Sequence, residues 1–227
     1  AAVLAFESVR AGTYVRTMED IPRIRQGYRF ALAPTADQQV FLRACVGASR
    51  FWFNQGLALT KERIARRVSG EAVSVPWSYE ALCTELPAKA RADLAPWQHE
   101  VVCGCYQAGF RALGRALQDF SNRRSEGQRA SFPQFRRKGG RQSEAVIFQR
   151  PRIVGHRHVE FDRRIGPVRS KERLTKLVHL LDSDDCARVL SSTVSRRNGK
   201  WFVSFTVERA RKKRQARRPN AVAGVDL

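Results

Sequence analysis

The sequence has 227 residues, with 42 Lys and Arg residues against 21 Asp and Glu residues, so its formal net charge is +21 and its isoelectric point lies near 11.1. This excess exceeds what solubility requires, and no apolar run approaches the ~18 residues of a membrane-spanning helix, so the partner we expect is nucleic acid rather than a membrane. The five cysteines are odd in number and show no framework spacing, which predicts reduced thiols in a cytoplasmic protein.

Residues 1–27 are predicted to be an N-terminal extension without a fold of its own. The opening AAVLAFESVR has a short apolar part and no basic residues before it, so it does not look like a secretory signal. The one methionine, Met18, stands shortly before the first expected strand, and we expect translation to begin at or near it.

Residues 28–34 are expected to hold the first strand. Tyr28–Leu32 (YRFAL) is typical of a strand, Pro34 ends it, and Thr35 is a candidate N-cap for a long helix. The apolar residues that recur at helical spacing along this helix are predicted to face the core: Phe41, Cys45, Ala48, Trp52 and Leu59.

Residues 35–124 are predicted to form a small helical bundle with a basic outer face. A second helix is expected to begin at Ser78, which would cap it, and Pro87–Pro96 is expected to be a connector. A third helix is predicted from about Gln98 to Asn122, with Arg111 on a different side from its apolar stripe.

Residues 125–208 carry β signals. The composition changes after Ser121, and the segments AVIFQ, RIVGHRHVEFD, PVR and VLSSTVSRRNGKWFVSFTVE follow. Asn198-Gly199 between two alternating runs predicts a hairpin with a type I′ turn. Lys171–Leu181 predicts a helix inserted among the strands. The chain is therefore expected to be α+β.

Two basic segments are candidates for nucleic-acid contact. In SFPQFRRKGG, aromatic rings that can stack on bases stand beside cations that can bind phosphates: Phe132, Phe135, Arg136, Arg137 and Lys138. The run RARKKRQARR at 209–218, within a basic linker at 209–220, is also expected to meet a phosphate backbone.

Other chemical motifs are weak or missing from the sequence. Cys103-Gly104-Cys105 lies near His99, but it falls within a predicted helix and lacks a second ligand pair, so a zinc site is not favoured. The sequence has no GxSxG elbow, phosphate-cradling GKS loop or dinucleotide-binding glycine motif, so any catalysis would have to come from carboxylates.

The order of several segments resembles the amino-terminal half of TnpB, the RNA-guided DNA endonuclease encoded by transposons of the IS200/IS605 group. The segments that carry the resemblance are YRFALAPTADQQVFL, GASRFWFNQGLAL, WSYEALCTEL, HEVVCGCYQAGFRALGRALQDF, SFPQFRRKG, STVSRRNGKWFVSF and AVAGVDL. The resemblance covers residues 28–227. It implies a helical recognition bundle inserted in a wedge-type antiparallel β-barrel, followed from residue 221 by the start of a RuvC (RNase H-like) nuclease domain.

The resemblance gives Asp226, in the closing GVDL, the role of the first catalytic carboxylate. Nucleases of this type hold Mg²⁺ between carboxylates from separate strands. One carboxylate does not complete such a site, and the family's further acidic residues and zinc element would lie beyond Leu227. We therefore expect a fragment or a truncated gene product that binds nucleic acid without cutting it.

The resemblance also implies partners and contact residues. A guide RNA would read the target DNA, while the protein would read a short motif beside it. Tyr79 and Gln107 match positions implicated in reading that motif, and Gln149 and Arg150 lie near another. The remaining candidates for nucleic-acid contact are basic or aromatic: Arg50, Arg111, Arg115, Phe135, Arg136, Arg137, Lys138, Arg211, Lys212 and Lys213.

Three other readings are weighed against a nuclease half. A nuclease-free, TnpB-derived module that represses or guides would share the same basic surfaces. A basic structural protein of a ribonucleoprotein would explain the net charge and the hairpin, but not GVDL. A helix-turn-helix transposase would need a compact recognition helix with a base-reading face, which is not evident in the sequence.

Overall fold

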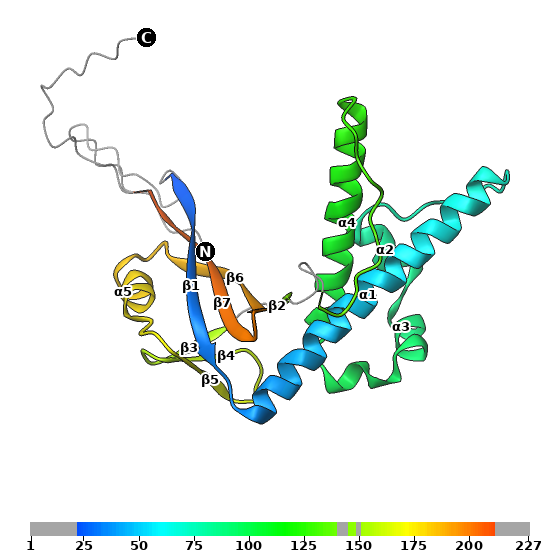
Figure 1. Ribbon diagram of the computed structural model, residues 1–227. Coiled ribbons are helices and arrows are strands. Elements are labelled where there is room, and N and C mark those ends of the chain that lie inside the picture. Colours follow the sequence, from blue (N-terminus) through cyan, green and yellow to red (C-terminus); the bar gives the residue numbers. More distant parts are fainter. Residues whose placement is uncertain (1–21, 140–144, 149–150, 212–227) are drawn as a thin grey trace, which may run out of the picture.

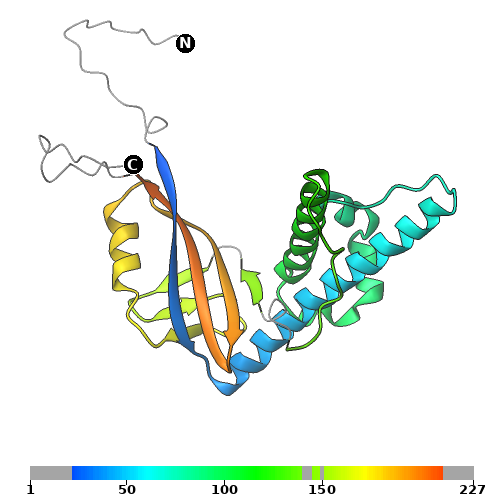
Figure 2. The same ribbon diagram turned by 45° about the horizontal axis from the view of Figure 1, so that its top comes forward.

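The computed structural model describes residues 22–139, 145–148 and 151–211. The elements are β1 (Arg23–Ala33), α1 (Ala36–Val68), α2 (Tyr79–Glu85), α3 (Ala88–Leu94), the 3₁₀ helix η2 (Pro96–Glu100), α4 (Gly104–Ser125), β2 (Ala145–Phe148), β3 (Arg152–Val154), β4 (His158–Glu160), β5 (Pro167–Ser170), α5 (Thr175–Ser183), β6 (Arg188–Arg197) and β7 (Lys200–Ala210). The sheet and α5 lie at one end, α2, α3 and α4 gather at the other, and α1 runs between them (Figures 1 and 2). This arrangement confirms the α+β class. None of the described helices is long and apolar enough to span a bilayer.

The strands form an antiparallel sheet in the order β2-β6-β7-β1-β5-β4-β3. β1 begins at Arg23, earlier than the predicted Tyr28, so the expected boundary at residue 27 was too late. The cause is its partner: β7 continues to Ala210, and the pairing runs from Arg23 opposite Ala210 to Leu32 opposite Trp201. A long partner strand thus extends a strand whose own sequence is weakly apolar.

The sheet is open in the described part of the chain. β2 and β3 lie at its two edges and do not pair with each other. The closed barrel that the resemblance implies therefore stays a prediction, as does the nuclease segment 221–227, which lies outside the described residues.

The β6–β7 hairpin forms as predicted. Its two-residue turn has positive φ angles at Asn198 (49°) and Gly199 (74°), as a type I′ turn requires. The residues that alternate along β7 on the buried face are at most 3% exposed: Trp201, Val203, Phe205 and Val207. α5 (Thr175–Ser183) lies against the sheet core and overlaps the predicted inserted helix at Lys171–Leu181, although it starts and ends later.

α1 is one uninterrupted helix of 33 residues that begins with a capping box. The Thr35 side chain accepts a hydrogen bond from the Gln38 backbone N–H, and the Gln38 side chain accepts one from Thr35 N–H. The predicted stripe is largely right, but Leu57 rather than Leu59 is fully buried.

α1 contributes to two hydrophobic cores in succession. Its first half packs on the sheet through Leu42, Cys45, Val46 and Ala48. Its middle then enters a second core with α2 and α4, which comprises Trp52, Phe53, Leu57, Leu82, Ala95, Phe110, Leu113 and Leu117. The sheet and the helical part are therefore joined by a continuous helix.

The region between α2 and α4 differs from the prediction. Ser78 caps α2 as expected, but the predicted connector contains α3, whose sequence AKARADL is rich in good helix formers. The helix predicted from Gln98 is α4, and it starts at Gly104, because Pro96 opens a 3₁₀ turn and Val101 is extended.

α4 crosses α1 closely at Gly109. A Cβ atom added there would lie 2.6 Å from the Ser49 carbonyl oxygen and 2.8 Å from the Phe53 backbone nitrogen. Because the obstructing atoms are largely backbone, this crossing requires glycine.

Candidate nucleic-acid interface

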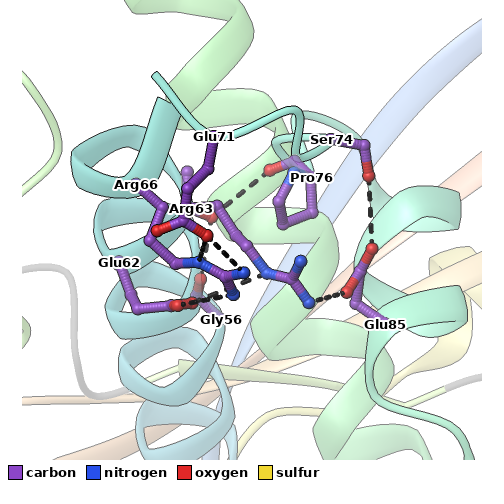
Figure 3. A network of polar contacts seen from close by, with 9 residues as sticks. Gly56, Glu62, Arg63, Arg66, Glu71, Ser74, Pro76 and Glu85 are labelled. Atoms are coloured by element: carbon purple, nitrogen blue, oxygen red, sulfur yellow. Dashed lines mark hydrogen bonds and ion pairs between the residues drawn. The ribbon is translucent and has the colours of Figure 1, made fainter. Parts of the chain in front are cut away.

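Some arginines of the helical part are neutralised by carboxylates. At the far end of α1, Arg63 pairs with Glu85 at 2.6 Å, and Arg66 pairs with Glu71 at 2.7 Å and Glu62 at 3.2 Å (Figure 3). These contacts tie the end of α1 to the following loop and to α2. Phosphate contacts are better sought among the cations without such partners.

The turn that begins at Phe132, named here the basic turn (132–138), is fixed on the helical part. The Phe132 ring lies 5.2 Å from that of Phe120 and 6.2 Å from that of Trp77. The Asn54 side chain on α1 donates to the Arg136 carbonyl oxygen at 3.0 Å and accepts from the Arg136 N–H at 2.8 Å. Phe132 and the basic residues of the turn are thus parts of one segment that is held against the helical part.

Arg136 points inward from the basic turn, unlike a phosphate-binding cation. Its guanidinium carbon lies 3.8 Å from the centre of the Phe53 ring, and burial lowers the pKa of the side chain. Its buried Nε has no hydrogen-bond partner among the described residues. Arg136 therefore serves to anchor the turn, whereas Arg137 and Lys138 are exposed.

Phe135 is the exposed aromatic residue of the basic turn. Its side chain is 48% exposed, and the Lys61 ammonium lies 4.6 Å from the centre of its ring. An exposed ring beside a cation can stack on a base while the cation meets a phosphate. Lys61 is absent from the sequence-based candidates because it lies far from the turn in sequence.

A first hollow of about 260 Å³ gathers three predicted contact residues. Tyr79 from α2 and Arg111 and Arg115 from α4 line it, together with Trp77, Ser78, Gly114 and Gln118. The Arg111 guanidinium carbon lies 4.8 Å from the centre of the Tyr79 ring. Burial raises the pKa of Tyr79, so its phenol stays protonated and can donate a hydrogen bond at neutral pH.

Gln107 lies on α4 but does not line this hollow. Its side-chain amide donates to the Tyr106 hydroxyl at 3.4 Å, and the Arg91 guanidinium carbon lies 4.0 Å from the centre of the Tyr106 ring. Gln107 lies one helical turn before Arg111 on the same face of α4, so it is near the first hollow although it does not line it.

A second hollow of about 390 Å³ brings together Arg50 and Lys138, which were both predicted contact residues. Arg43 and Arg196 also line it and were not predicted. A signal for Arg43 was available, because seven residues separate it from Arg50 and place both on one face of α1. No local pattern indicates Arg196.

The other predicted residues lie at or beyond the edge of the described chain. Arg211 is exposed after β7, and its backbone N–H donates to the Pro22 carbonyl oxygen at 2.7 Å. The remaining predictions fall outside the described residues: Gln149, Arg150, Lys212, Lys213 and Asp226. Within the described ranges, no three His, Cys, Asp or Glu residues are grouped so that they could hold a metal ion.

The fold is that of an α+β protein with basic hollows on its surface, and two comparisons bear on its family. Residues 18–68 match the helix-turn-helix domain of OrfB from IS605. Over 186 residues, or 81% of the chain, the sequence is 27% identical to InsQ of Escherichia coli (strain K12), which is named as a candidate RNA-guided DNA endonuclease. The matched part covers 40% of InsQ. Both matches support the resemblance to the TnpB family that the motifs of the chain carry.

The segment that matches the helix-turn-helix domain has a different shape here. Its described residues, 22–68, form β1 and the single helix α1. The described part of this segment therefore offers a long helix and its adjoining strand rather than two short helices.

Proposed function

We propose that this chain is the nucleic-acid-binding half of a transposon-associated, RNA-guided DNA endonuclease. The observation that carries the proposal is the first hollow, in which Tyr79, Arg111 and Arg115 offer a ring and two guanidinium groups to one ligand. Arginine and aromatic side chains are common contacts to phosphates and unstacked bases. The basic turn, with exposed Phe135, adds a second such surface.

The proposal extends to the partners and the place of action. A guide RNA and its target DNA would be the ligands, and the protein would act on the chromosome in the cytoplasm of a prokaryote. Asp226 would bind Mg²⁺ as one ligand of a RuvC-type site in a longer protein, whose zinc element would also lie outside this chain. Because one carboxylate does not hold a pair of metal ions, binding and not cleavage is the activity proposed for these 227 residues.

The test is the salt dependence of RNA binding by the full chain. Fluorescence anisotropy with a labelled single-stranded RNA would be measured between about 50 and 200 mM salt. Each lost phosphate contact lowers the slope of log affinity against log salt by about 0.7. The double variant Arg111→Gln with Arg115→Gln is expected to lower this slope by about 1.4.

The matched control is Arg63→Gln with Arg66→Gln, which removes the same net charge from cations already paired with carboxylates. It is expected to leave the slope nearly unchanged. Equal effects of the two double variants would mean that only the overall charge matters. A salt-independent affinity of the unaltered chain would overturn the proposed function.

A further inference from the structure

We propose that the second hollow is a specific binding site for a phosphate group of the nucleic-acid backbone. Its cations come from three separate parts of the chain: Arg43 and Arg50 from α1, Lys138 from the basic turn and Arg196 from β6. Trp201 of β7 completes the polar lining, and Val40, Ala44 and Val46 supply the apolar part. That the phosphate belongs to RNA or DNA rests on the proposed function.

The site is built by elements whose positions are fixed independently. Arg196 and Trp201 are register partners across the β6–β7 ladder, so their side chains lie on the same face of the sheet. Asn54 fixes the basic turn against α1 through its two hydrogen bonds with Arg136. Arg43, Arg50 and Arg196 are thus held together by regular secondary structure, and Lys138 follows the anchored Arg136 by two residues.

Two buried donors in this lining have no acceptor. Trp201 is only 3% exposed, and neither its indole Nε1 nor the buried Nε of Arg196 has a hydrogen-bond partner among the described residues. A buried N–H without a partner is costly, and both groups can donate but not accept. A ligand that satisfies them must therefore bring acceptor oxygens.

The charges in the hollow favour an anion. Within the described ranges, none of its four cations has a carboxylate within ion-pair distance. The other end of the same sheet is different, because Glu208 pairs with Arg23 at 3.3 Å and with Arg188 at 2.8 Å. Like charges collected around one hollow repel each other, and a bound phosphate would remove that cost.

A backbone phosphate fits the surroundings better than free phosphate. Val40 at the hollow is 59% exposed and offers an apolar surface to a sugar. Phe135, three residues before Lys138, is also exposed and could stack on a neighbouring base. A nucleotide chain could use these apolar surfaces and the cations together, whereas an inorganic ion would use the cations alone.

The test compares Arg196→Gln and Trp201→Phe with the control Arg188→Gln in the full chain. Arg188 lies on the same strand, and Glu208 keeps its contact with Arg23 when Arg188 is replaced. Arg196→Gln is expected to weaken binding of a labelled single-stranded RNA about tenfold and to lower the salt slope by about 0.7. Trp201→Phe keeps an aromatic ring and removes the N–H, so a loss of about threefold with an unchanged slope is expected.

Thermal unfolding without RNA separates binding from folding. Trp201→Phe removes a buried donor without a partner but also leaves space in the sheet core, so the free chain is expected to unfold cooperatively at a similar or somewhat lower temperature. A cooperative transition well above the assay temperature would show that weaker RNA binding does not come from unfolding. If the unaltered chain binds RNA with a salt-dependent affinity and both variants behave as Arg188→Gln does, the site is refuted and the proposed function stands. If the unaltered chain does not bind RNA, both the phosphate site and the proposed function are refuted.

Inorganic phosphate distinguishes the source of the ligand. The backbone site predicts that inorganic phosphate competes with RNA for the unaltered chain and has less effect on Arg196→Gln at the same ionic strength. If inorganic phosphate stabilises the unaltered chain through Arg196 but does not displace RNA, the site binds a free anion and the backbone assignment is overturned.

Discussion

Two glycines inside helices are predicted to respond to alanine with opposite signs. Gly109 on α4 faces α1, where an added Cβ would lie 2.6 Å from the Ser49 carbonyl oxygen, 2.8 Å from the Phe53 nitrogen and 2.9 Å from the Trp52 Cβ. At Gly47 on α1, an added Cβ would meet only the end of the Arg50 side chain, at 3.8 Å. The two substitutions add the same atoms in different surroundings.

The expected magnitudes follow from these contacts. Alanine gains about 1 kcal/mol over glycine in a helix interior, and this gain should appear in full for Gly47→Ala. For Gly109→Ala the same gain is opposed by overpacking of about 3 kcal/mol, because backbone atoms must move, so a net loss of about 2 kcal/mol is expected. The melting temperature should rise by about 2–4 °C in the first variant and fall by about 4–8 °C in the second.

Urea and thermal unfolding, followed by circular dichroism, measure both changes. RNA affinity provides a second readout, since displacement of α4 would move Arg111 and Arg115 relative to Tyr79. A Gly109→Ala chain as stable as the unaltered one would refute the close crossing of α1 and α4. A destabilised Gly47→Ala chain would contradict the open space beside Gly47.

Two further predictions concern the start of α1 and the ion pair between Asp162 and Arg164. Thr35→Ala removes the side-chain half of the capping box and should cost about 1 kcal/mol, measured by urea unfolding. Asp162 binds Arg164, which also donates to the His99 carbonyl oxygen at 3.1 Å, and the hydrogen bonds from Arg164 lower the pKa of Asp162. Because that folded-state pKa is depressed, the pair stabilises the fold above about pH 4 and loses its effect as pH falls through the lowered pKa. The stability difference between the unaltered chain and Asp162→Asn should therefore shrink below about pH 4 in unfolding measured against pH; a difference independent of pH would contradict the ion pair.

Local chemistry explains which parts of the fold could be predicted from sequence. Asn198-Gly199 and Thr35 specify a turn and a helix start through their own backbone preferences and side chains, and both are found where expected. The start of β1 was misplaced because its first residues are held by pairing with β7. That pairing lies far along the chain and leaves little local signal.

In the candidate interface, too, local sequence signals could be recognised and long-range contacts could not. The basic turn could be recognised from its composition, but not which of its cations faces inward, since Asn54 and Phe53 on α1 decide the position of Arg136. The meeting of Arg196 and Trp201 with Arg50 depends on how the sheet packs beside α1. Sequence patterns can propose contact residues, whereas tertiary structure selects and combines them.

The continuity of α1 sets a rule for how chains of this kind can vary in length. The helix spans 33 residues, or roughly 50 Å, and connects the sheet core to the helical core without a break. One inserted or deleted residue in its middle would turn everything beyond it by about 100° and shift it by about 1.5 Å. Insertions and deletions should therefore accumulate in the loops at 70–77 and 126–131, while the middle of α1 keeps a constant length.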